Sequence, residues 1–347
     1  MNMNLDEKIE IELKKDIKIP QSVLNKVDRA FEEIREEEGN VAKSVCTFNK
    51  KLVASLVAVL VISGLIISPK VFASISSIFK DRGIQKATNN GYSYESTENL
   101  VKDSGITMNI DSVVSDKNKI GIAFTFRFDD TSKLKNVNDI KLGLNIKDNN
   151  GRVLIEHLSE GLYTPMKIGQ NSNTDASNKI TGEIKYYLIM YSIDGKLDNI
   201  NNLSINIDEI KLYEENIGFS TAIDGDWKLS LDLDNKNKQI ETIKYIAEES
   251  NDIVTLNSIE VMPTGSIINM DINKKVDENI INKIILTDES GENIYKFTNG
   301  NMEDTESGIN ISFMYDLTTF DNLDKLKMII KDIEREDIVL NLIKEDK

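Results

Sequence analysis

The order of apolar and polar residues divides the chain into regions of different character. An early segment carries one apolar stripe at helical spacing, an uncharged run follows at residues 52–69, and most of the remaining chain alternates with a period of two. These patterns predict a tail over residues 1–50, a transmembrane helix over 51–69, a stalk or interfacial segment over 70–91, and β-sandwich domains over 92–238 and 239–347.

The clearest period-two segment predicts a half-buried β-strand. Its apolar residues occupy every second position, namely Ile120, Ile122, Phe124, Phe126 and Phe128. Asp148 to Gly151 predicts a hairpin turn into a strand at 153–155. Further candidate strands lie at 106–110, 142–146, 184–191, 203–207 and 227–233. About seven strands suffice for a small sandwich, and we expect Trp227 and its neighbours to close it.

The same order of strands and turn recurs beyond a boundary predicted near residues 235–244. A second Asp-x-x-Gly turn spans Asp288 to Gly291. The candidate strands around it are 254–256, 268–272, 284–286, 294–295, 311–315, 326–330 and 338–342. A repeated order predicts a duplicated module. The predicted fold class is therefore mainly β, with two tandem Ig-like β-sandwich modules after one transmembrane helix and a short N-terminal amphipathic helix.

The uncharged run has the length and composition of a membrane-spanning helix. At about 1.5 Å per residue its apolar part reaches roughly 25 Å, and lysines on either side can extend toward the two interfaces. A secretory signal peptide is the alternative, because Val71-Phe72-Ala73 resembles a cleavage site. The position of the apolar run argues against a signal peptide, because a long patterned segment precedes the run and a signal peptide has only a short basic leader. Flanking positive charges do not decide the orientation, and the large C-terminal region favours a cytoplasmic N-terminus.

The tail contains a short amphipathic helix, predicted over residues 20–37. Pro20 is tolerated at a first helical position, and Gly39-Asn40 supplies a stop. The apolar stripe of this helix is the candidate partner-binding surface, formed by Val23, Leu24, Val27, Ala30, Phe31 and Ile34. Because an isolated helix of this length is marginal in water, the stripe needs a partner, and one candidate is a groove on a cytoplasmic protein. A helix lying on the membrane, or packed against residues 1–18, fits the pattern equally well.

Composition and charge narrow the classes of function. The chain has 58 acidic residues against 42 basic ones, and a net charge of −16 disfavours nucleic acid as a partner. One cysteine, Cys46, excludes an intramolecular disulfide, and one histidine, His157, lies in a hydrophilic stretch typical of a surface side chain. We therefore predict no catalytic residue, no cofactor and no metal site, and we do not expect an enzyme.

Several segments together resemble a known family. They are the run from Ser68 through Phe72 to Lys80, the Tyr94-Glu95-Ser96 segment leading to Ser104-Gly105-Ile106-Thr107, and the Ile259 to Gly265 segment of the second module. With Ile19-Pro20 opening the tail helix, the chain resembles bacterial membrane-anchored negative effectors of extracytoplasmic-function sigma factors, whose outer region carries a domain of unknown function. The resemblance implies an inner tail that holds a sigma factor off RNA polymerase and outer modules that sense the envelope, with release by proteolysis near the membrane.

The function predicted from these observations is that of a single-pass membrane regulator. Its N-terminus is expected in the cytoplasm, bound to a sigma factor, and its C-terminal region outside, facing an envelope ligand of unknown identity. The alternative is an extracytoplasmic binding or adhesion module that the membrane helix anchors.

Overall fold

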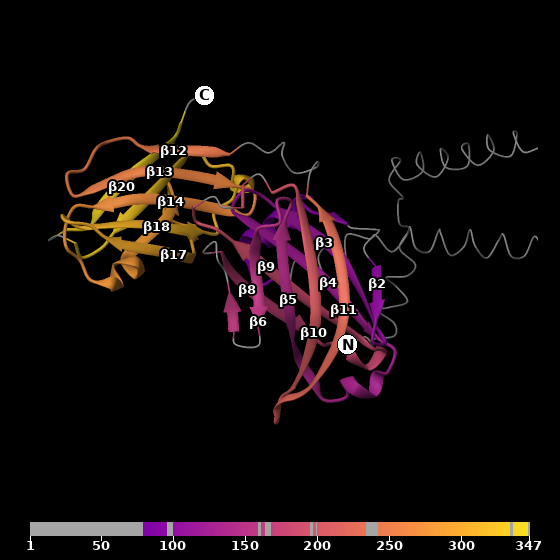
Figure 1. Cartoon of the computed structure of the whole chain (residues 1–347). Helices are drawn as coiled ribbons and strands as arrows, with labels where there is room; N and C mark the ends of the chain where they lie inside the picture. The colour runs from indigo at the N-terminus through magenta and orange to yellow at the C-terminus, as the bar shows by residue number, and fades with distance from the viewer. Residues whose placement is uncertain are drawn as a thin grey trace, which may run out of the picture. The chain divides into compact units, whose positions relative to one another are not determined.

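A computed structural model describes residues 79–95, 100–158, 161–163, 168–194, 197–198, 200–233, 242–333 and 336–345. All of these residues belong to one compact unit of the chain. Strands dominate it (Figure 1), so the prediction of a mainly β chain is confirmed.

One helix and the first set of strands form what we call the first module. In chain order they are α5 (Arg82–Asn89), β1 (Tyr94–Glu95), β2 (Leu100–Asp103), β3 (Ile106–Ser115), β4 (Lys119–Phe128), β5 (Val137–Asp148), β6 (Val153–Leu158), β7 (Gly161–Tyr163), β8 (Gly169–Asp175), β9 (Glu183–Tyr191), β10 (Asn202–Glu214) and β11 (Gly218–Asp232). Short 3-10 helices lie at Thr131–Leu134 and Lys179–Thr181.

The remaining strands form the second module. They are β12 (Ile243–Ala247), β13 (Val254–Met262), β14 (Gly265–Ile272), β15 (Ile284–Asp288), β16 (Ile294–Tyr295), β17 (Phe297–Asp304), β18 (Ile309–Tyr315), β19 (Lys325–Ile330) and β20 (Ile338–Lys344). Its 3-10 helices are Glu278–Lys283 and Thr319–Asp321.

The first module consists of two sheets that share one core. One sheet has the order β1-β3-β4-β9-β8, with β2 also paired to β3, and the other has the order β11-β10-β5-β6-β7. Alternate side chains of both sheets meet in a single buried cluster that includes Phe124, Leu144 and Ile205. Trp227 on β11 is fully buried and donates a hydrogen bond from Nε1 to the Ile106 carbonyl on β3, at 3.0 Å. This contact ties the two sheets together, as the sequence predicts for Trp227.

The second module repeats this strand order. The path β12-β13-β14-β18-β17 corresponds to β1-β3-β4-β9-β8, and β20-β19-β15-β16 corresponds to β11-β10-β5-β6. The difference is at β12, which pairs with both β13 and β20 and so joins the two halves into one nine-stranded sheet. The second module therefore has one continuous sheet, where the sequence led us to expect two separate ones.

The correspondence between the two modules extends to the β-bulges in their strand pairs. The β3–β4 pair has a bulge between Ile110 and Ser112, and the β13–β14 pair has one between Leu256 and Ser258. Bulges shift the register by one residue, so equal placement fixes which positions correspond. Below we use these equivalences: Ala123 with Asn269, Tyr187 with Ser312, and Asn173 with Asn301.

Some predictions concern parts of the chain that the structure does not describe. The tail helix, its stripe (Val23, Leu24, Val27, Ala30, Phe31 and Ile34) and the predicted transmembrane helix all lie outside the described residues. Among the residues that are described, no helix has the length and apolar character needed to cross a bilayer. Of the predicted stalk or interfacial segment, residues 79–91 are described, and they pack against the first module.

Candidate functional site

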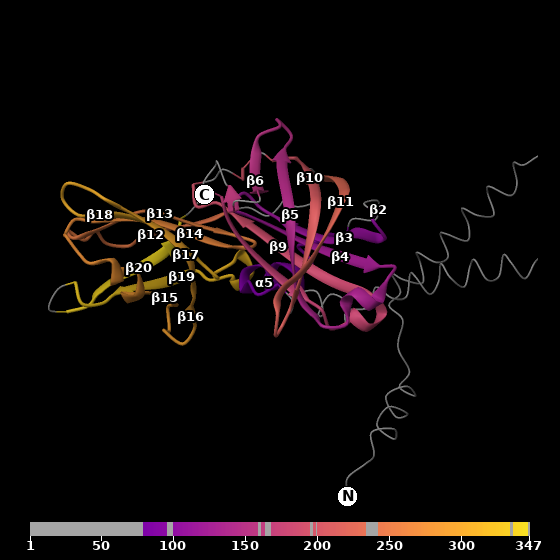
Figure 2. The same ribbon diagram turned by 60° about the horizontal axis from the view of Figure 1, so that its bottom comes forward.

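The segment that follows the apolar run folds onto the outer face of the first module. Asp81 caps α5, because its Oδ1 accepts a hydrogen bond from the Ile84 amide at 2.9 Å. Ile84 and Ala87 are buried on one side of the helix. With Phe79 and Tyr92 they cover an apolar patch of β3, β4 and β9 that consists of Val114, Ala123, Tyr187 and Ile189. A helix of eight residues is unstable alone, so this packing holds it in place. Figure 2 shows α5 beside β9.

Two glycines allow α5 to lie this close to its neighbours. A Cβ on Gly121 of β4 would approach Ile84 Cδ1 to 2.9 Å and Phe79 Cε1 to 3.3 Å. A Cβ on Gly83 would lie 1.9 Å from the carbonyl oxygen of Thr264, which belongs to the second module. A larger residue at Gly83 would therefore push α5 and Thr264 apart, because it meets backbone atoms, whereas one at Gly121 would require the Ile84 and Phe79 side chains to move.

The first helical turn is in contact with both modules through a buried lysine. Lys119 is 2% exposed, and its ammonium group donates to Asp81 Oδ2 at 2.7 Å and to the Thr264 carbonyl at 3.1 Å. A buried charge is tolerated only when it is paired and hydrogen-bonded. Lys119 therefore holds the N-terminus of α5, the first module and the second module at one point.

The turns at this point occupy equivalent places in the two modules. One joins β3 to β4 and the other joins β13 to β14. Asp116 Oδ2, in the first turn, accepts hydrogen bonds from the Thr264 amide at 2.9 Å and from its hydroxyl at 2.6 Å. Its Oδ1 accepts from the amides of Asn118 and Lys119, both at 2.9 Å. The carboxylate thus orders its own turn and binds the turn of the other module.

Ion pairs extend the contact along α5. Lys86 donates to Asp321 at 2.7 and 2.8 Å and to the Asp316 carbonyl at 3.2 Å, and Arg82 lies 3.0 Å from Asp316 Oδ2. Lys117 pairs with Glu260. Arg82 is half exposed, so its pair is worth less than that of the more shielded Lys86.

The tyrosines of this junction are held in the neutral form. Burial, reinforced by the charge of Asp116, raises the pKa of Tyr92, whose hydroxyl donates to the Ser115 carbonyl at 3.0 Å. Burial also raises the pKa of Tyr187, and of Tyr295 beside Asp321. These phenols therefore stay neutral and contribute packing, and Tyr92 also donates a hydrogen bond.

We call this set of contacts the α5 junction: α5 with Asp81, Asp116 and Lys119 on one side and Thr264, Asp316 and Asp321 on the other. Sequence patterns did not identify it, because a lone Lys or Asp in a turn carries no periodicity. Phe79 and Thr264, however, lie in segments that carried the family resemblance.

His157 lies elsewhere, on β6, where its Nε2 is 2.7 Å from Gln170 Nε2.

Comparisons with known proteins give no family for this chain. No protein-family model matches it, and neither does any curated protein. A crystal structure of a conserved domain protein from Bacillus anthracis is similar at a TM-score of 0.45 and 13% identity, over 74% of this chain and 90% of that one.

Proposed function

We propose that this chain is a single-pass membrane regulator of the anti-sigma type. In this proposal residues 51–69 span the membrane, the cytoplasmic tail binds a sigma factor through the stripe centred on Val27, and two modules of the Ig-like sandwich class sense the envelope on the other side. The chain performs no catalysis and needs no cofactor.

The observation that supports this proposal is the α5 junction. Residues 79–92 follow the predicted span closely, and contacts from both modules hold them. A change in how the modules meet would therefore alter the anchoring of the segment next to the membrane. If an envelope ligand binds one arrangement of the two modules more tightly than another, its binding shifts the population toward that arrangement. In this proposal the shift would change how the cytoplasmic tail holds the sigma factor.

Co-purification tests the cytoplasmic half of the proposal. The full chain, solubilised in detergent, is expected to capture the sigma factor encoded beside its gene. Val27→Asp, which puts a charge in the apolar stripe, should abolish capture. Asn25→Asp is the matched control, because residue 25 lies on the opposite side of the predicted helix. Lack of capture by the unmodified chain would reject the proposal.

A second candidate is an envelope-binding or adhesion module whose tail is only an anchor. The polar side chains that line a groove on the second module favour it. Deleting residues 1–45 separates the two candidates, since the regulator should then lose control of transcription and the adhesion module should not.

A further inference from the structure

The outer face of the second module carries a row of polar side chains that crosses its strands. Backbone register places Ser258 opposite Asn269, Asn269 opposite Ser312, and Ser312 opposite Asn301. The Asn269 amide donates to Ser258 Oγ at 3.0 Å, and Ser312 Oγ donates to Asn269 Oδ1 at 2.6 Å. Ser258, Asn269 and Ser312 are therefore connected and oriented before any ligand arrives, and Asn301 extends the row.

A second row lies beside the first. Asp271 is opposite Asn310, and Asn310 is opposite Glu303. Asp271 accepts hydrogen bonds from Asn310 at 2.8 Å and from Asn257 at 2.8 Å. These bonds lower the pKa of Asp271, so its carboxylate stays ionised and keeps the neighbouring amides in place.

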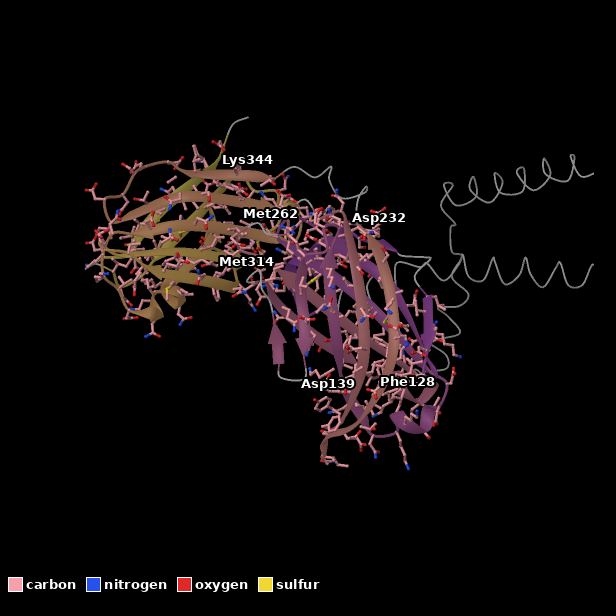
Figure 3. All side chains as sticks on the ribbon, viewed as in Figure 1. Phe128, Asp139, Asp232, Met262, Met314 and Lys344 are labelled. Carbon is pink, nitrogen blue, oxygen red and sulfur yellow. The ribbon has the colours of Figure 1, made fainter. Side chains whose placement is uncertain are left out.

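The first row lines a groove together with Asn310 and Glu303 of the second row, and the first module completes this groove. The groove has a volume of about 820 Å³, and Tyr191, Ile193, Asp194 and Lys117 line it from the first module. Next to it, Met262 and Met314 (labelled in Figure 3) pack with Ile267 against Tyr191 and Ile193. The groove thus has an apolar floor at the junction and a polar wall on the second module.

The equivalent face of the first module carries an apolar patch that α5 covers. Polar residues remain beside this patch, because Ser112 and Asn173 are the equivalents of Ser258 and Asn301. Where the second module has Asn269 and Ser312, the first has Ala123 and Tyr187, which α5 buries. A sheet face that only meets water is commonly occupied by charged and β-branched residues, and asparagine is depleted in strands. Repeated asparagines on β14, β17 and β18 therefore point to recognition.

We propose that this groove binds an uncharged oligosaccharide. Asparagine and serine present both donors and acceptors, which match hydroxyl groups that do the same. The Tyr191 ring supplies one apolar surface for a sugar ring, in the combination of aromatic and placed polar groups that small-molecule sites use. Among the described residues that line the groove, Lys117 pairs with Glu260, and the further carboxylate of Glu303 disfavours anionic polymers.

A ligand in this groove would contact both modules, close to Thr264 and Lys119 of the α5 junction. The binding site follows from the structure alone, whereas its use as an envelope signal rests on the proposed function. Binding is measured without a sigma factor, so either idea can fail while the other stands.

Calorimetric titration of the full chain in detergent tests the site. The probes are neutral tetrasaccharides of the cello-, malto-, manno- and N-acetylchito- series, with an oligogalacturonate as the anionic probe and oligolysine as the cationic one. At least one neutral probe should bind, and Asn301→Ala and Asn310→Ala should each weaken binding about fivefold to tenfold, the effect of one lost hydrogen bond.

The matched control is Asn173→Ala, the equivalent of Asn301 in the first module. It should leave the affinity unchanged. Asn310→Ala also removes the hydrogen bond to Asp271 and should lower the unfolding temperature slightly, so all titrations are made well below that temperature. The proposal is overturned if no neutral probe binds, if only the charged probes bind, or if Asn301→Ala and Asn173→Ala behave alike.

Discussion

The two modules use the same sheet face in opposite ways. In the first, an apolar patch on the outer face of β3, β4 and β9 is buried under α5. In the second, the equivalent face of β13, β14 and β18 is polar and borders the groove. A duplicated scaffold leaves both copies with a spare face, since only the inner faces are needed for a core. Different residues at a few equivalent positions give the first face a helix as its partner, whereas the second face borders a groove in the part of the chain that the structure describes.

The largest expected effect comes from exchanging a residue of the covered face for its equivalent on the open one. Tyr187 is 2% exposed, and its ring meets Phe79 edge-on at 5.1 Å. Tyr187→Ser should lower the free energy of unfolding by about 3–5 kcal/mol, because it leaves a cavity under α5. Thermal unfolding measures the loss, and trypsin cleavage after Lys86 should become faster as α5 detaches.

Tyr187→Phe is the control for that experiment. The hydroxyl of Tyr187 is buried and makes no hydrogen bond within the described residues. Its removal should therefore leave stability unchanged or slightly higher. If Tyr187→Phe and Tyr187→Ser lowered the free energy of unfolding equally, the aromatic ring would not be the group that holds α5.

The next effect concerns the contact between the modules. Lys119→Met should lower the free energy of unfolding by about 2–3 kcal/mol, because Asp81 and the Thr264 carbonyl lose their shared donor. The double variant Lys119→Met with Asp81→Asn should regain part of the loss, since it removes the unpaired carboxylate and keeps a helix cap. A double-mutant cycle on thermal unfolding measures the coupling. Strict additivity would mean that the pair does not couple in solution.

A smaller effect compares the repeated turns. Burial disfavours ionisation of Asp148, but hydrogen bonds from the Arg152 amide and side chain and from the Asn150 amide outweigh it and lower its pKa. Asp288 has a lowered pKa for a similar reason, through Asn293 and Ser290. A lowered carboxyl pKa adds stability that is present above the unfolded-state pKa, about 3.9, and lost as the pH falls through the folded-state pKa.

Asp148→Asn should therefore lower the free energy of unfolding by about 1–2 kcal/mol at neutral pH. The difference from the unmodified chain should shrink as the pH falls below about 4. Urea unfolding at a series of pH values measures both. Asp288→Asn should follow the same pH trend, and a constant difference at all pH values would mean that packing, and not charge, is responsible.

The sequence predicts strands well where their apolar residues alternate, although the strand predicted as half-buried, β4, is buried on both faces because α5 covers its outer side. β4, β9, β10 and β18 were all expected, because their apolar residues alternate. The repeated Asp-x-x-Gly turns also follow from the sequence, since Gly151 and Gly291 adopt positive φ angles of 76° and 80°. Strands β8 and β17 were not expected. They are polar edge strands, with no residue of either fully buried, so hydrophobic periodicity has nothing to detect.

The functional surfaces are harder to predict than the strands, for a related reason. The α5 junction depends on single residues such as Lys119, Asp116 and Thr264, which come together only when equivalent turns of two modules meet. The groove depends on cross-strand register, which places Asn269, Ser312 and Asn301 in one row although they are far apart in the chain. A duplicated pattern predicts that positions correspond, but it does not indicate which copy of a face is covered.

The smallest effect on stability should come from the reverse exchange, Ser312→Tyr. Ser312 borders the open groove, so a larger side chain has space, and the loss of one hydrogen bond to Asn269 costs about 1 kcal/mol or less. The new ring would fill part of the groove, however, and should weaken oligosaccharide binding more than Asn301→Ala does. Thermal unfolding and calorimetric titration of the same sample test this contrast. If Ser312→Tyr destabilised the chain as much as Tyr187→Ser, the face of the second module would be as tightly packed as that of the first, and the contrast between the modules would fail.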